Sequence, residues 1–294
     1  MEPETPNPTV PPSPLYGFPQ EWSAFAERQA EFTKRFINID NAIKTAFQRL
    51  HKTSTMTERT IYFLGRLGVE EFMEILLLSA NGYGIGAQKI VRGMYERAVT
   101  ARYLHKFPAE TENYLAYKRV ADHKLLRASQ TTMGSDVFSE EQSDNIVRDF
   151  EAVKERFTIS ECRTCKTTRL NHSWSKVDII SMARMADTNL WKWAVPGYYR
   201  PMQELHSSLS AIFSRLDPDA VKSGEGLIFD GAAQPERADE ALVTGFYILL
   251  NILDLQQECF RIEEFQPLLQ TCVDDFMIIM RDQKPIAAST PASR

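Results

Sequence analysis

Residues 55–108 read TMTERTIYFLGRLGVEEFMEILLLSANGYGIGAQKIVRGMYERAVTARYLHKFP, which is the pattern of two helices joined by a turn. Thr55 and Glu58 have the spacing of a capping box at the start of the first helix. The apolar residues that follow recur in steps that place them on one helical face: Ile61, Leu64, Leu67, Phe72, Ile75 and Leu76. Residues 81–84 break the pattern, and Pro108 ends the second helix. We therefore predict a helical hairpin.

The helical pattern continues outside this hairpin. No proline lies between Pro19 and Pro108, and residues 22–50 carry an apolar stripe with three- and four-residue steps. Ser139 and Gln142 form a second capping box ahead of another periodic segment. No internal repeat divides the chain. We predict an all-α fold, a single helical bundle of roughly eight or nine helices.

The two ends of the chain lack this pattern. Seven of the 15 prolines lie within residues 1–19, where apolar residues are few. Residues 1–18 are therefore predicted to be a disordered tail, and residues 282–294 a second one. A single α-helical domain is predicted over residues 19–281.

Three predictions concern the second half of the chain. Residues 159–173 are predicted to be a loop, after which Ser173 caps a short helix that contains Trp174. A late helix is predicted from its apolar residues between 202 and 216. Residues 222–234, rich in glycine and small side chains, are predicted to be a long mobile loop.

Composition excludes several classes of protein. The 34 Lys and Arg residues against 39 Asp and Glu give a net charge of −5, so no global positive field attracts nucleic acid, although a local basic face is compatible with it. Four cysteines are too few for a disulfide scaffold, and the N-terminus lacks a secretory signal, so we expect reduced thiols and a cytoplasmic location. The apolar runs are shorter than the roughly 20 residues of a membrane span, so no membrane contact is expected.

Arg92 and Glu96 are the first candidate site residues. They are four residues apart and so share one face of the predicted second helix. A solvated ion pair explains them, and so does a half-buried pair that organises a cleft, because apolar residues flank both. The sequence supports the solvated pair and the half-buried pair equally well.

Cys162 and Cys165, with His172 further on, have the spacing of metal ligands in a polar loop. A structural zinc site needs four ligands, and no second close pair follows. We therefore predict unligated cysteines, no metal and no cofactor, with zinc binding by Cys162, Cys165 and His172 as the less favoured alternative.

Arg200 and His206 are the candidate catalytic pair, six positions apart near the start of the late helix. A guanidinium can bind a phosphodiester while an imidazole transfers a proton near neutral pH. The competing interpretation is a histidine at the edge of the core, hydrogen-bonded to a neighbour.

The motifs also indicate a family. The run from Val91 to Leu104, VRGMYERAVTARYL, followed by Trp174, Tyr199 and the segment Glu-Leu-His206-Ser, resembles the bacterial helical proteins catalogued as domain of unknown function 5677. The likeness covers roughly residues 60–260. It implies a helical bacterial protein and no particular activity. Its signature positions would include Arg92, Glu96, Trp174, Tyr199 and His206.

The Arg200 and His206 spacing also resembles that of HEPN-type (higher eukaryotes and prokaryotes nucleotide-binding) helical ribonucleases. In that motif a polar residue follows the arginine, whereas here Pro201 does. The resemblance implies cleavage of RNA without a metal and a homodimer that brings two motifs together.

The function itself is unknown from the sequence, which leaves open an enzymatic role. The leading hypothesis is a metal-independent ribonuclease or nucleotide-binding protein, with His206 as acid–base group, Arg200 as phosphate ligand, and Arg92, Glu96 and Tyr199 lining the site. The alternative is a non-catalytic helical protein-interaction module, for which an uncovered apolar helix face would be the sign.

Overall fold

The computed structural model describes residues 18–47, 53–133, 137–160, 168–186, 188–205, 208–224 and 226–282. Within these ranges the chain is almost wholly helical, with thirteen α-helices and one two-stranded sheet. The all-α prediction is confirmed, and the helices are more numerous than the eight or nine predicted. The predicted tails lie almost entirely outside the described residues. None of the described helices is both long and apolar enough for a bilayer crossing.

The chain divides into two compact units. The first comprises residues 1–51, 63–98 and 192–294, and the second comprises residues 52–62 and 99–191. The single domain over residues 19–281 stays a prediction.

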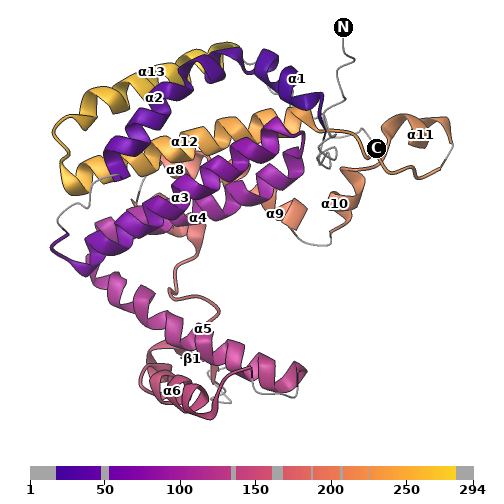
Figure 1. Cartoon of the computed structure of the whole chain (residues 1–294). Helices are drawn as coiled ribbons and strands as arrows, with labels where there is room; N and C mark the ends of the chain where they lie inside the picture. Colours follow the sequence, from indigo (N-terminus) through magenta and orange to yellow (C-terminus); the bar gives the residue numbers. More distant parts are fainter. Residues whose placement is uncertain are drawn as a thin grey trace, which may run out of the picture. The chain divides into compact units, whose positions relative to one another are not determined.

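The first unit is a layered arrangement of long helices, in which α2 and α13 lie side by side (Figure 1). Its long helices are α2 (Ala30–Phe47), α3 (Met56–Ala80), α4 (Gly84–Lys106), α12 (Pro235–Phe260) and α13 (Phe265–Asp282), of which α3 and α4 also contribute residues to the second unit. Its short elements are α1 (Glu21–Arg28), η3 (Val195–Tyr199), α9 (Arg200–Leu205), α10 (Leu209–Phe213) and α11 (Pro218–Ser223).

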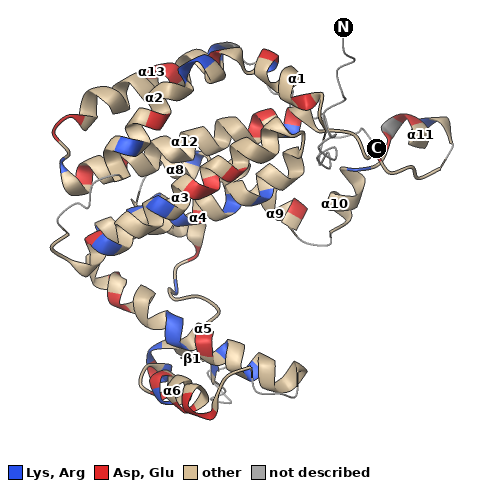
Figure 2. Cartoon of the chain, viewed as in Figure 1, with Lys and Arg blue, Asp and Glu red and all other residues tan. Residues whose placement is uncertain are grey.

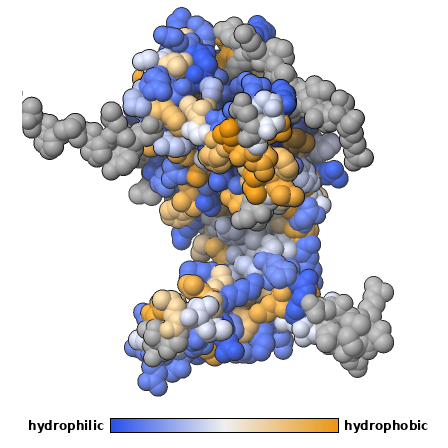
Figure 3. Space-filling view, turned by 90° about the vertical axis from the view of Figure 1, so that its right-hand side faces the viewer, coloured by the Kyte–Doolittle hydropathy of each residue, from blue (hydrophilic) through white to orange (hydrophobic). Residues whose placement is uncertain are grey.

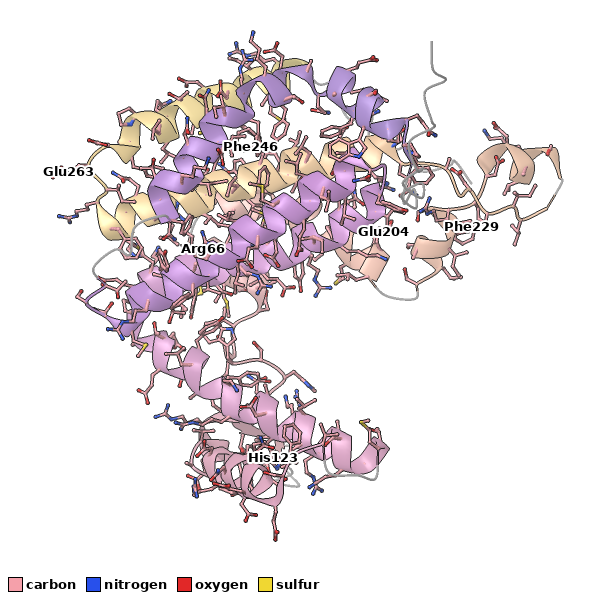
Figure 4. The ribbon with its side chains drawn as sticks, in the orientation of Figure 1. Arg66, His123, Glu204, Phe229, Phe246 and Glu263 are labelled. Atoms are coloured by element: carbon pink, nitrogen blue, oxygen red, sulfur yellow. The ribbon has the colours of Figure 1, made fainter. Side chains whose placement is uncertain are left out.

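Phe246 on α12 marks the centre of the first unit's core (Figure 4). Its ring contacts Phe32 of α2, Phe72 of α3 and Phe276 of α13, with ring centroids 6.0, 6.3 and 5.4 Å away. Burial of one such side chain stabilises a fold by about 2 kcal/mol. The same apolar stripes that predicted the helices therefore also meet in one core.

The second unit is built around a pair of packed helices, α5 (Thr111–Thr132) and α6 (Glu140–Glu151). Its core consists of Val120, Phe150, Val153 and Phe157. The remaining elements are η1 (Pro108–Glu110), η2 (Lys154–Phe157), β1 (Thr158–Ser160), β2 (Thr168–Leu170), α7 (Ile179–Ala186) and α8 (Thr188–Lys192), whose last residue belongs to the first unit.

Both predicted capping boxes are confirmed. The Thr55 hydroxyl accepts from the Glu58 amide, and the Glu58 carboxylate accepts from the Thr55 amide, each at 3.1 Å. Ser139 and Gln142 make the equivalent pair of hydrogen bonds at 3.2 and 2.9 Å. The predicted turn after α3 contains Gly82 at a φ of 78°, a conformation that glycine adopts without strain.

Several boundaries were predicted wrongly. The first stripe is two helices, α1 and α2, separated at Gln29. Residues 159–173, predicted to be a loop, include most of an antiparallel strand pair, in which Thr158 pairs with Leu170 and Ser160 with Thr168. A strand of three residues is too short for an alternation of apolar and polar side chains to be recognised in a sequence.

Ser173 does not cap a helix that contains Trp174. Helix α7 begins at Ile179, and the Asp178 carboxylate accepts from the amides of Ile180 and Ser181, both at 3.0 Å. Trp174 therefore lies in the segment before the helix.

The late helix is also interrupted, since α9 ends at Leu205 and α10 begins at Leu209 with Ser208 as its cap. Part of the predicted 222–234 loop is paired: the amide of Asp217 donates to the Ile228 carbonyl at 2.8 Å, and that of Asp230 donates to the Arg215 carbonyl at 2.6 Å. Long-range pairing of this kind leaves no local signal.

Candidate functional site

A single turn of π-helix, η3, positions the first part of the candidate site. Gly197 in this turn lies against the buried ring of Tyr95 on α4, so closely that a Cβ atom on Gly197 would stand 2.6 Å from Tyr95 Cδ2. The close approach holds the next three residues, Tyr198, Tyr199 and Arg200, beside α4. π-turns of this kind occur frequently at functional sites.

Arg92 on α4 contacts both its own helix and this turn. Its Nε donates to Glu96 Oε1 at 2.9 Å, and its guanidinium carbon lies 4.9 Å from the centre of the Tyr198 ring. The Tyr198 ring in turn contacts Tyr199, with centroids 5.5 Å apart. The four-residue spacing of Arg92 and Glu96 therefore forms the predicted ion pair, and the tyrosine ring holds the guanidinium in one orientation.

Arg200 is held by a carboxylate from a third element. Its guanidinium donates to Glu240 on α12, and Glu240 is buried, with 7% of its surface exposed. Gln88 on α4, one turn before Arg92, donates to the other oxygen of Glu240 at 2.9 Å. Arg237 completes the set, with a terminal nitrogen 3.8 Å from Glu240. A buried carboxylate with several donors is a rigid anchor for an arginine.

We call this set the arginine cluster: Gln88, Arg92, Glu96, Tyr198, Tyr199, Arg200, Arg237 and Glu240. Its three guanidinium groups and two carboxylates sum to a charge of +1. Figure 2 shows both acidic and basic residues along α3 and α4. Arg92 and Arg200 each use one nitrogen in an ion pair. Their other N–H groups have no partner among the described residues, so both can donate to an anion.

The structure brings together four of the five residues that the sequence predicted for the site. Arg92, Glu96, Tyr199 and Arg200 all belong to the arginine cluster in the first unit. His206 lies outside the described residues, one position beyond the end of α9. The catalytic assignment of Arg200 and His206 therefore stays a prediction.

Sequence reasoning missed Gln88 and Glu240. Glu240 lies at the charged start of α12, beside Glu236, Arg237 and Asp239, so the sequence does not show that this carboxylate is the one buried with Ala238, Ala241 and Leu242. A charged residue at such a position needs a partner, but the partner lies 40 residues away in the chain. Only the folded arrangement identifies it as Arg200.

The described residues do not test the zinc alternative. They contain no group of three or more His, Cys, Asp or Glu side chains that could hold a metal ion. Cys162 and Cys165 lie outside the described residues, and His172 is exposed. Cys272 is buried, and burial raises the pKa of its thiol to about 12, so it stays protonated.

The fold and the site define an all-α protein with a charged cluster held between its helices. A model described as a family of unknown function (DUF5677) matches residues 60–223. This segment is more than half of the 294 residues, and the chain belongs to that family, as the resemblance indicated. The match includes Arg92 and Arg200, whereas Glu240 lies beyond it. Neither the curated proteins nor the solved structures contain a match to the chain.

Proposed function

We propose that the arginine cluster binds a phosphate-bearing ligand, RNA or a nucleotide, and that His206 cleaves a phosphodiester by acid–base catalysis. The observation that supports binding is the pair of oriented guanidinium groups, Arg92 and Arg200, each anchored to a carboxylate and each with N–H groups left over. Such groups match the geometry of phosphate oxygens. Tyr199, with 45% of its surface exposed, offers a ring on which a base can stack.

The proposed reaction requires no metal. The His206 imidazole takes the proton of a ribose 2′-hydroxyl, and the 2′-oxygen attacks the adjacent phosphorus. The bond from phosphorus to the 5′-oxygen breaks, and this oxygen receives the proton from the imidazolium. The products are a 2′,3′-cyclic phosphate and a free 5′-hydroxyl. Arg200 would stabilise the charge that develops on the phosphate oxygens.

The test is cleavage of a labelled mixed RNA pool by purified protein in the presence of a chelator. We expect cleavage by the native chain and loss of at least about a hundredfold in His206→Ala, the usual contribution of a general acid–base group. His172→Ala, which removes an exposed histidine of the second unit, is the matched control and should cleave normally.

Arg200→Lys separates binding from folding. A lysine retains the charge toward Glu240 but lacks the planar fork, so we expect weaker RNA binding in a folded protein. If native protein and His206→Ala are equally inactive while both are folded, the ribonuclease proposal is wrong. The non-catalytic interaction module then becomes the better explanation.

A second proposal follows from an exposed apolar surface in the first unit. Seven large apolar side chains between residues 209 and 229 are each 45% to 78% exposed; we call them the arm surface: Leu209, Ile212, Phe213, Val221, Leu227, Ile228 and Phe229. Figure 3 looks onto the side of the molecule where α10 and α11 lie and shows hydrophobic side chains gathered there. Phe229 points outward on this arm in Figure 4. Surfaces of this kind commonly mark partner contacts.

We propose that a second copy of the chain covers the arm surface. The described charges of the arm are balanced and satisfied internally: Lys222 lies 3.6 Å from Asp219, and Arg215 donates to the carbonyls of Asp230 and Ala232 at 3.2 Å. Two such arms can therefore face each other without repulsion between like charges. The arm begins three residues after His206, so a homodimer formed there would bring two copies of the proposed catalytic segment near one interface.

A further inference from the structure

The second unit contains a pocket that is separate from the arginine cluster. Its volume is about 240 Å³, and it is lined by the end of α4, the η1 turn with the start of α5, the η2–β1 segment, and residues 171–177. Its lining includes two aromatic side chains, Tyr103 and Trp174, and three charged ones, Glu110, Arg156 and Lys176. The volume equals that of about eight water molecules in the liquid, enough for a small ring with one substituent.

Aromatic side chains form one wall of the pocket. The Trp174 ring is half-buried and is fixed by two neighbouring rings, Tyr103 at 6.0 Å and Tyr114 at 5.3 Å between centroids. Phe157, which is buried in the unit's core, lines the pocket as well. A planar ligand ring can pack against such a wall at little entropic cost.

The polar groups of the pocket favour an anion. Two cations, Arg156 and Lys176, face one carboxylate, Glu110, and that carboxylate already accepts from Asn113 at 3.2 Å. Lys176 is exposed and has no ion-pair partner among the described residues. Among the described residues, the Arg156 side chain forms an ion pair with Glu112 at 2.5 Å, and this exposed pair contributes little to stability and can exchange.

Tyr103 adds a neutral donor. Burial, with a smaller effect of Glu110, raises the pKa of its phenol, so the hydroxyl keeps its proton. This hydroxyl has no hydrogen-bond partner within the described part of the chain. A ligand oxygen in the pocket could accept from it.

The segment that carries Trp174 and Lys176 is held in place before any ligand arrives. The Asn171 amide donates to the Phe157 carbonyl at 2.7 Å, and the Asn171 side chain donates to the Ser175 carbonyl at 3.0 Å. Tyr117 donates to the Asn171 carbonyl at 3.1 Å. A pocket wall fixed by these bonds loses little freedom on binding, which favours affinity.

We propose that this pocket binds a small aromatic molecule that carries one anionic group, a carboxylate or a phosphate. The ring packs on Trp174, and the anion lies between Lys176 and Arg156. The proposal is independent of the ribonuclease, because no residue of the arginine cluster lines the pocket.

The test is binding of four small probes to the full chain, measured by ligand-observed NMR titration. Benzoate and phenyl phosphate supply the ring with either anion, benzamide supplies the ring without charge, and inorganic phosphate supplies charge without a ring. We expect one or both aromatic anions to bind at least about tenfold more tightly than benzamide and inorganic phosphate, the gain from one charge-assisted hydrogen bond. Whichever of benzoate and phenyl phosphate binds more tightly identifies the anionic group of the ligand as a carboxylate or a phosphate.

Variants then locate the binding. Lys176→Ala should weaken binding of the preferred anion by about tenfold. Lys176→Arg should restore it, and Lys118→Ala, which removes an exposed lysine on α5 outside the pocket, should leave it unchanged. Arg200→Lys should also bind normally, so that failure of the ribonuclease proposal does not affect this result.

Three outcomes would overturn the proposal: no binding of either aromatic anion, equal binding of benzamide or inorganic phosphate, or equal affinity in Lys176→Ala and the native chain. In each of these outcomes the ring and the anion are not recognised together in this pocket.

Discussion

Gly197 is the single residue on which the geometry of the arginine cluster depends most. A side chain at this position would push η3 away from Tyr95, because the Tyr95 ring is fully buried and has no space to move aside. We predict that Gly197→Ala destabilises the protein by about 1–3 kcal/mol, the usual cost of overpacking. The midpoint of urea denaturation measures it.

Gly231→Ala is the matched control, because no atom lies within 4 Å of the position of its Cβ. Its free energy of unfolding should change by less than about 0.5 kcal/mol. Similar effects of the two substitutions would show that the contact between Gly197 and Tyr95 does not hold the turn.

The sequence predicted those site residues whose partners lie nearby in the chain. Arg92 and Glu96 are one helical turn apart, so their pairing follows from spacing alone. Arg200 and Tyr199 were predicted from a short motif. The anchor of Arg200 could not be predicted, because Glu240 becomes its neighbour only when α12 packs beside η3.

At the scale of elements, stacking between α5 and α6 makes the second unit sensitive to acid. The His123 ring lies flat on Phe150, with centroids 3.8 Å apart and planes 2° from parallel, and Figure 4 places His123 between these helices. Burial, aided by the charge of Arg127, lowers the pKa of His123 below its usual 6.5. The folded state therefore favours the neutral ring.

We predict that this stacking loses stability in acid. The unfolded chain binds a proton at His123 near pH 6.5, whereas the folded chain binds it only at lower pH. The stabilisation is therefore complete above pH 6.5 and is lost as pH falls through the lowered value. His123→Phe, which retains a stacked ring without a titrating group, should show a flatter dependence of its unfolding midpoint on pH. Parallel pH profiles for the two proteins would contradict this.

Some helix boundaries can be predicted from local sequence patterns, whereas others depend on tertiary contacts. Capping boxes are local, and both were predicted correctly at Thr55 and Ser139. The break between α9 and α10 was not predicted, because the apolar stripe runs through it without interruption. In the structure the second half of that stripe is exposed, so its periodicity reflects a surface and not a core.

At the scale of the whole molecule, that exposed stripe is the reason to expect a homodimer. Helices α2 and α13 also carry apolar stripes, but they pack on each other, where the buried Asp275 accepts from Asn38 at 2.8 Å and pairs with Arg35 at 3.0 Å. They are therefore not free to bind a partner. The arm surface, by contrast, is an apolar face that remains uncovered among the described residues of the first unit.

We predict that the native chain has twice its 33.6 kDa monomer mass in solution, as measured by light scattering after gel filtration. Phe213→Asp combined with Leu227→Asp places two charges on the arm surface and should give the monomer, because a buried unpaired charge costs more than the contact contributes. Ile37→Asp, which adds a charge at an exposed apolar position on α2, should remain dimeric. A native chain that is monomeric at every concentration would refute the homodimer. A dimer that persists in the double variant would mean that a different face joins the two copies.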